Sequence, residues 1–236
     1  MYAKVALFAL ALSPLVSAHG KVAVITGDLG GNGTALGIMG AVVPGAGPNR
    51  KTEVDTTVFN SDNIRTDNDL GHTTKNGNNQ LSDLKQAMAQ SGDTLPQVSS
   101  GGSVQGTYHI VTTDGAGPLE ALIDETATGK WSQANQATVS TQPPGHHGNI
   151  AASNNKRNLM GRMIGDLTKR AGNVNEDHDF AVQIPAGTSC TGTINGISNL
   201  CLVKVSNNNK AGPFGGVFAV QMGANSTTAK KVGRDF

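Results

Sequence analysis

Apolar residues in this chain occur in short runs, separated by polar segments rich in glycine and asparagine. Runs of this length between turn-forming residues are typical of β-strands. The stretch Thr107–Asp124 predicts two strands joined by a glycine turn at Asp114–Pro118. Further strands are predicted at residues 21–26, 180–185, 201–206 and 216–222.

Two segments have the apolar spacing of a helix instead. In residues 78–91 the spacing is carried by Leu81, Leu84 and Met88, and Gly92 can end the helix. A second helix is predicted over residues 153–170, from a capping serine to a closing Lys-Arg pair. Residues 55–79 and 131–152 are polar and predict long surface loops. Short strands, long loops and two modest helices predict an all-β antiparallel β-sandwich.

The first 18 residues have the composition of a secretory signal peptide. Lys4 precedes an apolar run, and the small residues Val16 and Ala18 stand where signal peptidase requires them. We therefore expect a signal peptide over 1–18 and a single mature domain over 19–236. The mature chain would begin with His19, whose α-amine and imidazole can chelate one metal ion. Cu(II) prefers such tetragonal nitrogen ligands.

Composition narrows the function further. Removing residues 1–18 lowers the formal net charge from +1 to zero, because Lys4 is the only charge lost, so we expect no nucleic-acid partner. No later apolar stretch is long enough to cross a membrane. In a secreted chain the cysteines Cys190 and Cys201 most simply form a disulfide. Asn32 and Asn225 begin glycosylation sequons, which agrees with secretion to the extracellular space or cell wall. We also expect a monomer.

Four stretches resemble the Egh16-like family of secreted fungal proteins, which are associated with appressoria and virulence. They are residues 109–118, 185–192, 201–204 and 211–221. The order of features also resembles lytic polysaccharide monooxygenases, which are immunoglobulin-like sandwiches with a copper histidine brace. This resemblance implies that His19 and His109 bind one copper ion. It also implies that Phe214 occupies the axial side of the site, with Phe218 as the alternative.

Other histidines remain alternatives to His109. The pair His146-His147 can bind metal from a loop, but adjacent residues of an extended chain point apart. His72 lies in a polar loop without a partner by spacing. His178 lies within the charged cluster 176–179, for which an outer-sphere base is the alternative to the expected charged loop. Neither a Gly-x-Ser-x-Gly nor a His-Glu-x-x-His motif is present.

Two functions therefore stay open. The first is a copper-dependent monooxygenase that oxidises a cell-wall polysaccharide, bound through the loops at 55–79 and 131–152. The second is a non-catalytic virulence effector or surface protein that binds a host surface component. The N-terminal histidine favours the first function. The low aromatic content of 4% favours the second, because few rings are left to stack on sugars.

Overall fold

The computed structural model describes residues 20–40, 53–152, 172–210 and 212–223. His19, Asn225, the signal segment and the helix expected at 153–170 lie outside these residues. Within them, no helix is both long enough and apolar enough to cross a lipid bilayer.

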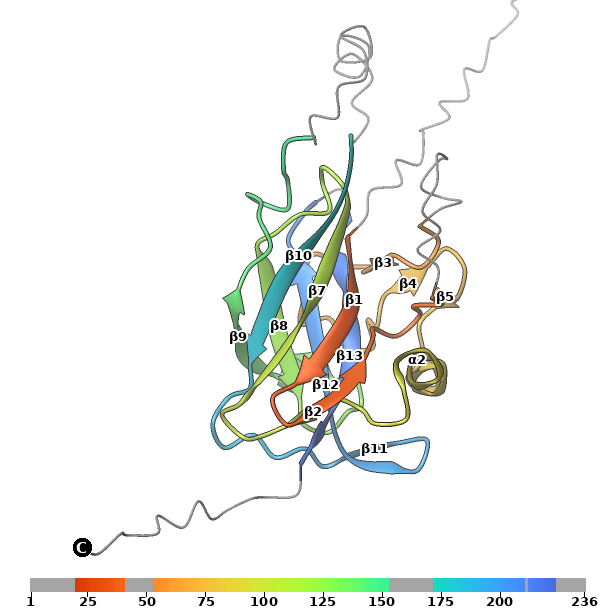
Figure 1. The fold of residues 1–236 in the computed structure, drawn as a ribbon, viewed down its shortest axis with the longest axis vertical. Helices are drawn as coiled ribbons and strands as arrows, with labels where there is room; N and C mark the ends of the chain where they lie inside the picture. Colours follow the sequence, from red (N-terminus) through yellow and green to blue (C-terminus); the bar gives the residue numbers. More distant parts are fainter. Residues whose placement is uncertain (1–19, 41–52, 153–171, 211, 224–236) are drawn as a thin grey trace, which may run out of the picture.

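Seven strands of the described chain close into a mixed β-barrel (Figure 1). Their order around the ring is β12-β8-β9-β10-β7-β1-β13, and β13 pairs back onto β12. Neighbours in the ring are antiparallel except β1 and β13, which are parallel. The bounds are β1 Gly20–Gly27, β7 Ser103–Thr112, β8 Leu119–Asp124, β9 Asn135–Thr141, β10 Asn173–Gln183, β12 Ile197–Asn207 and β13 Phe214–Met222.

Short strands extend the sheet outside the ring. They are β2 Gly30–Gly33, β3 Thr57–Val58, β4 His72–Thr73, β5 Gly77–Asn78, β6 Gln97–Val98 and β11 Gly192–Ile194. The predicted strands are all present, and β9 adds one inside the segment 131–152 that was expected to be a loop. The chain is mostly β, as predicted, but the expected antiparallel immunoglobulin-like sandwich is not what the pairings form. The parallel β1–β13 pair and the β12–β13 pair join all the strands into one closed sheet.

The helix predicted over 78–91 is present. A 3-10 turn, η1 (Leu81–Asp83), leads into helix α2 (Leu84–Ser91). The backbone amide of Gly92 donates a hydrogen bond to the carbonyl of Met88, and its positive φ of 107° ends the helix as a glycine can. In Figure 1, α2 lies beside the barrel, near β2 and β5.

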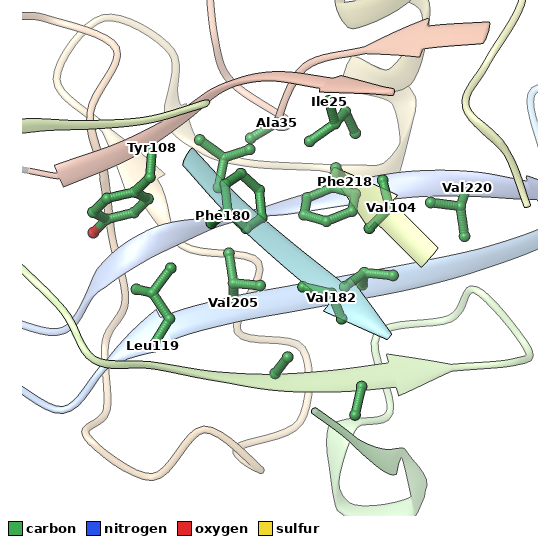
Figure 2. Close-up of a cluster of buried hydrophobic side chains, with 14 of the residues drawn as sticks. Ile25, Ala35, Val104, Tyr108, Leu119, Phe180, Val182, Val205, Phe218 and Val220 are labelled. Atoms are coloured by element: carbon green, nitrogen blue, oxygen red, sulfur yellow. The ribbon is translucent and has the colours of Figure 1, made fainter. Parts of the chain in front are cut away.

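The interior of the barrel is filled by apolar side chains from every strand of the ring (Figure 2). The rings of Phe180 and Phe218 meet edge to face at its centre, with centroids 6.5 Å apart. Burying one such side chain contributes about 1.5–3 kcal/mol. Phe218 is therefore a core residue, and of the two phenylalanines suggested by the sequence only Phe214 remains near an end of the barrel.

A second apolar cluster covers the outer face of β8, β12 and β13. Phe59, Leu70 and Trp131 pack there against Leu202 of β12. The segment 55–79 is consequently not the exposed loop that its polar sequence predicts, because many of its residues are buried. Since β12 is buried on both faces, apolar residues follow one another from Leu200 to Val203 instead of alternating with polar ones.

Lys204 lies inside this outer cluster and is fully buried. Its Nζ donates a hydrogen bond to the carbonyl of Asp69 at 3.0 Å and lies 3.7 Å from the carboxylate Oδ2 of the same residue. The ammonium also lies 4.3 Å from the ring centroid of Phe59 and 5.4 Å from that of Trp131. Burial lowers the pKa of Lys204 to about 8, opposed by Asp69. Lys204 thereby holds the 55–79 segment against β12.

Cys190 and Cys201 form a disulfide, the pair that the sequence predicts. Replacing both with alanine should destabilise the protein by about 2–3 kcal/mol, because the unfolded chain gains the freedom of the closed loop. The free energy of unfolding in urea measures this loss. The double variant should have the same free energy of unfolding as the fully reduced wild type. Equal stability of the oxidised and reduced wild type would contradict the prediction.

Candidate functional site

Three strand ends meet where β1 begins, at the upper end of the barrel in Figure 1. Lys21 of β1 lies opposite His109 of β7 in the antiparallel pairing. On its other side Lys21 pairs with Gly215, which directly follows Phe214. The structure thus brings together the strand positions next to His19, His109 and Phe214, although His19 itself lies outside the described residues.

Gly20 leaves no room for a side chain at the start of β1. A Cβ at this position would lie 2.3 Å from the carbonyl oxygen of Gly115 and 2.3 Å from the hydroxyl of Tyr108. The first strand therefore packs tightly against the turn that follows β7. This contact fixes the backbone that leads to His19.

His109 is 8% exposed and uses one ring nitrogen in the described structure. Its Nδ1 lies 2.7 Å from Oδ1 of Asp177, the residue opposite it on β10. Its buried Nε2 has no hydrogen-bond partner and lies 3.9 Å from Oε1 of Glu53. When Nδ1–H of a neutral imidazole donates a hydrogen bond to a carboxylate, the lone pair on Nε2 stays free. Metal-binding histidines are held in this way.

Lys21 is the buried cation of the site, with 1% exposure. Its Nζ donates hydrogen bonds to Oε2 of Glu53 at 2.9 Å and to Oδ1 of Asp55 at 2.6 Å. One ammonium and two carboxylates give this group a formal charge of −1. Glu53 therefore connects Lys21 with His109, and the three residues form one polar cluster with Asp55 and Asp177.

Phe214 is 2% exposed and begins β13. Its backbone amide donates a hydrogen bond to Oδ1 of Asn207 at 2.9 Å. In the sheet Phe214 lies opposite Val58 of the antiparallel strand β3. The amide of Asn207 also donates to the carbonyl of Ala116 at 2.9 Å. Asn207 thus ties the start of β13 to the turn after β7.

The alternative histidines lie elsewhere in the described structure. His146 and His147 are exposed in a turn closed by the bridge between His146 and Asn149. His72 lies on β4 and His178 on β10. None of these four forms a described hydrogen bond or ion pair with His109 or Lys21. Among the described residues no three His, Cys, Asp or Glu side chains form a group arranged for a metal ion. The predicted copper site also uses His19, which lies outside the described residues, so this finding does not test it.

Sequence reasoning missed Lys21, Glu53 and Asp55, and it considered Asp177 only as a member of the acidic cluster at 176–179. A lysine in the apolar run of a first strand is a weak signal that the strand end is buried with a partner. The partners themselves come from a segment more than 30 residues away, and no spacing rule connects them.

Comparison with known proteins places the chain among virulence factors. Residues 17–215 match the model of the Egh16-like virulence factors. The chain is 37% identical over 217 residues to the appressoria-specific virulence factor GAS1 of Pyricularia oryzae. The aligned region covers 91% of this chain and 76% of that relative. It is 34% identical to GAS2 of the same organism over 53% of this chain, but over only 37% of that relative. The expected likeness to monooxygenases stays a prediction.

Proposed function

The chain belongs to the Egh16-like virulence factor family, and on this basis we propose that it is a secreted, non-catalytic virulence protein. It acts at the surface where the infecting cell meets its host, by binding a wall or host surface component. The disulfide supports the secretory route, because such bonds persist in oxidising compartments.

One observation carries the non-catalytic proposal. Every described phenylalanine, tyrosine and tryptophan is at most 3% exposed. Proteins that grip a flat polysaccharide surface for chemistry usually present aromatic rings to stack on the sugars. The described aromatic rings of this chain are instead packed inside the barrel and beneath the 55–79 segment.

Complementation tests this role. The chain, introduced into a Pyricularia oryzae strain that lacks GAS1, should restore lesion formation on the host, and His109→Ala should restore it equally well. A form without residues 2–18 is the matched control and should fail, because it is not secreted. Restoration by the wild type but not by a stably folded His109→Ala protein would contradict the non-catalytic proposal.

A second function is favoured by the geometry of His109. The carboxylate of Asp177 accepts a hydrogen bond from Nδ1–H and orients the ring, and the buried Nε2 is left as a free nitrogen ligand. These residues fit a copper site completed by the amine and ring of His19. A bound copper ion would supply redox chemistry with O2 or H2O2 toward a cell-wall polysaccharide. The chain's own residues would orient the ligands, and the buried ring of Phe214 at the start of β13 would lie beside the site without binding.

Asp177→Ala should weaken Cu(II) binding about 10- to 100-fold in the secreted protein that begins at His19, because the His109 ring loses its positioning partner. Titration followed by electron paramagnetic resonance measures both affinity and ligand set. His109→Ala should abolish the all-nitrogen signal. The matched control, Asp179→Ala, removes an exposed aspartate from the same strand and should leave the affinity unchanged. Unaltered copper binding in His109→Ala would refute this second function.

A further inference from the structure

A cavity of about 560 Å³ lies beside the candidate site, between β1, β2 and α2. These three elements lie together on one side of the barrel in Figure 1. Its walls include Ala23, Val24, Thr34, Ile38, Asp55 and Gln90. Its volume is within the range of small-molecule binding sites. Lys21 and Asp55 belong to both the cavity and the polar cluster described above.

Two residues that line the cavity each have a buried oxygen without a hydrogen-bond partner. These oxygens are Oδ2 of Asp55 and Oγ1 of Thr34, in residues that are 1% and 7% exposed. The other carboxylate oxygen of Asp55 accepts a hydrogen bond from Lys21. A buried polar atom without a partner costs free energy, so its partner is expected to come from outside the protein. Both atoms belong to residues that line this one cavity.

The chemistry of the wall selects the ligand. Oδ2 of Asp55 only accepts hydrogen bonds, whereas the hydroxyl of Thr34 can donate or accept. Gln90 uses its Nε2 on the carbonyl of Ile38, which leaves its Oε1 as a further acceptor. The charged residues of the wall, Lys21 and Asp55, are paired with each other and carry opposite charges, so the wall favours a neutral ligand. Val24 and Ile38 add apolar area for the carbon face of a ring.

We propose that this cavity binds one residue of a neutral saccharide, whose hydroxyl groups donate to Asp55 and exchange a hydrogen bond with Thr34. The proposal rests on the proposed binding role of the chain and names its ligand class. The sugar has two possible sources. One is a saccharide from the surroundings. The other is a glycan on Asn32, which is exposed, lines the cavity and begins the sequon that ends at Thr34.

Asn32 is suited to carry such a glycan. Its Oδ1 accepts a hydrogen bond from Thr26 at 2.9 Å, and its Nδ2, the atom to which a glycan is attached, is not used in that bond. The first sugar on Asn32 would then lie at the rim of the cavity.

The first arm of the test uses purified protein without glycans. Calorimetric titration with cellohexaose, laminarihexaose, xylohexaose, mannohexaose and chitohexaose should show binding of at least one of these probes. Thr34→Val should weaken it about fivefold, which is the loss of one hydrogen bond. Thr57→Val is the matched control, because its hydroxyl is also buried and unpartnered but does not line the cavity. It should leave the affinity unchanged.

A second variant keeps the test valid if Thr34→Val fails to fold. Ala23→Leu places an apolar side chain in the cavity at a half-buried position of β1. It should weaken saccharide binding at least tenfold.

The second arm distinguishes the two sources. Protein glycosylated at Asn32 and trimmed to one N-acetylglucosamine is compared with Asn32→Gln. A linked sugar in the cavity raises the melting temperature and weakens hexasaccharide binding at least tenfold, whereas a free saccharide source leaves both unchanged. No binding of any probe in the first arm, together with no stabilisation in the second, overturns the proposal. Both arms use purified protein, so their failure leaves the infection result that tests the proposed function intact.

Discussion

Lys21→Met is expected to destabilise the protein by about 3–5 kcal/mol at neutral pH, the cost of removing one partner from a buried ion pair. The substitution keeps the length of the side chain but leaves the carboxylates of Glu53 and Asp55 facing each other without a cation. Both carboxylates are buried, at 5% and 1% exposure, so water cannot replace the lost ammonium. Urea unfolding measures the change as a shift of the midpoint at constant slope.

Two controls separate this electrostatic cost from a general effect of losing lysine. Lys85→Met removes an exposed lysine of α2 and should change stability by less than about 0.5 kcal/mol. Combining Lys21→Met with Glu53→Gln and Asp55→Asn removes the uncompensated charge and should recover part of the loss. If the triple variant is no more stable than Lys21→Met alone, charge is not the cause.

Lys204 is expected to make the stability of the protein rise between about pH 8 and pH 10.5. Burial lowers its pKa in the folded protein to about 8 from the ordinary value of 10.5. Between these values the unfolded chain binds more protons than the folded one, so stability increases with pH. Below pH 8 both states are protonated and the cost of burying the charge is fully present. The gain across the window is roughly 3 kcal/mol, at 1.36 kcal/mol for each pKa unit.

The measurement is the difference in unfolding free energy between the wild type and Lys204→Met at each pH, because other groups titrate equally in both. Tyr108 is one of these groups, since burial raises its pKa above the ordinary value. In the variant the carboxylate of Asp69 still accepts hydrogen bonds from the backbone amides of Asn60 and Gly71, so the substitution does not leave it without a partner. A difference that stays constant from pH 7.5 to 10.5 would show that Lys204 has an ordinary pKa in the folded protein.

The strands could be predicted from the sequence, because apolar runs between glycine and asparagine turns are a local signal. Their partners could not. β1 pairs with β7 and with β13, which lie about 80 and 190 residues further along the chain, and periodicity has no information on such distances. The same short strands fit a sandwich and a barrel equally well. The parallel pairing of Lys21 with Gly215 decides between them.

The burial of the 55–79 segment had one usable signal. Lys204 interrupts the apolar run of β12, and a charge inside a strand buried on both faces requires a partner. That partner is Asp69, in the segment whose polar composition suggested a surface loop. The sequence predicts His109 as a ligand but does not connect it with the carboxylate of Asp177, because the two residues meet only through the register of β7 and β10.

The position of β1 in the ring also determines when the protein can fold during synthesis. Among the described residues β1 is the first strand to be synthesised, and the last described strand, β13, is one of its two neighbours in the ring. The barrel therefore cannot close until almost the whole chain has been made, and β1 and β12 each keep an open edge until then. Contacts this distant in sequence slow folding and expose strand edges to aggregation. Closure of the barrel is thus expected to follow the synthesis of β13.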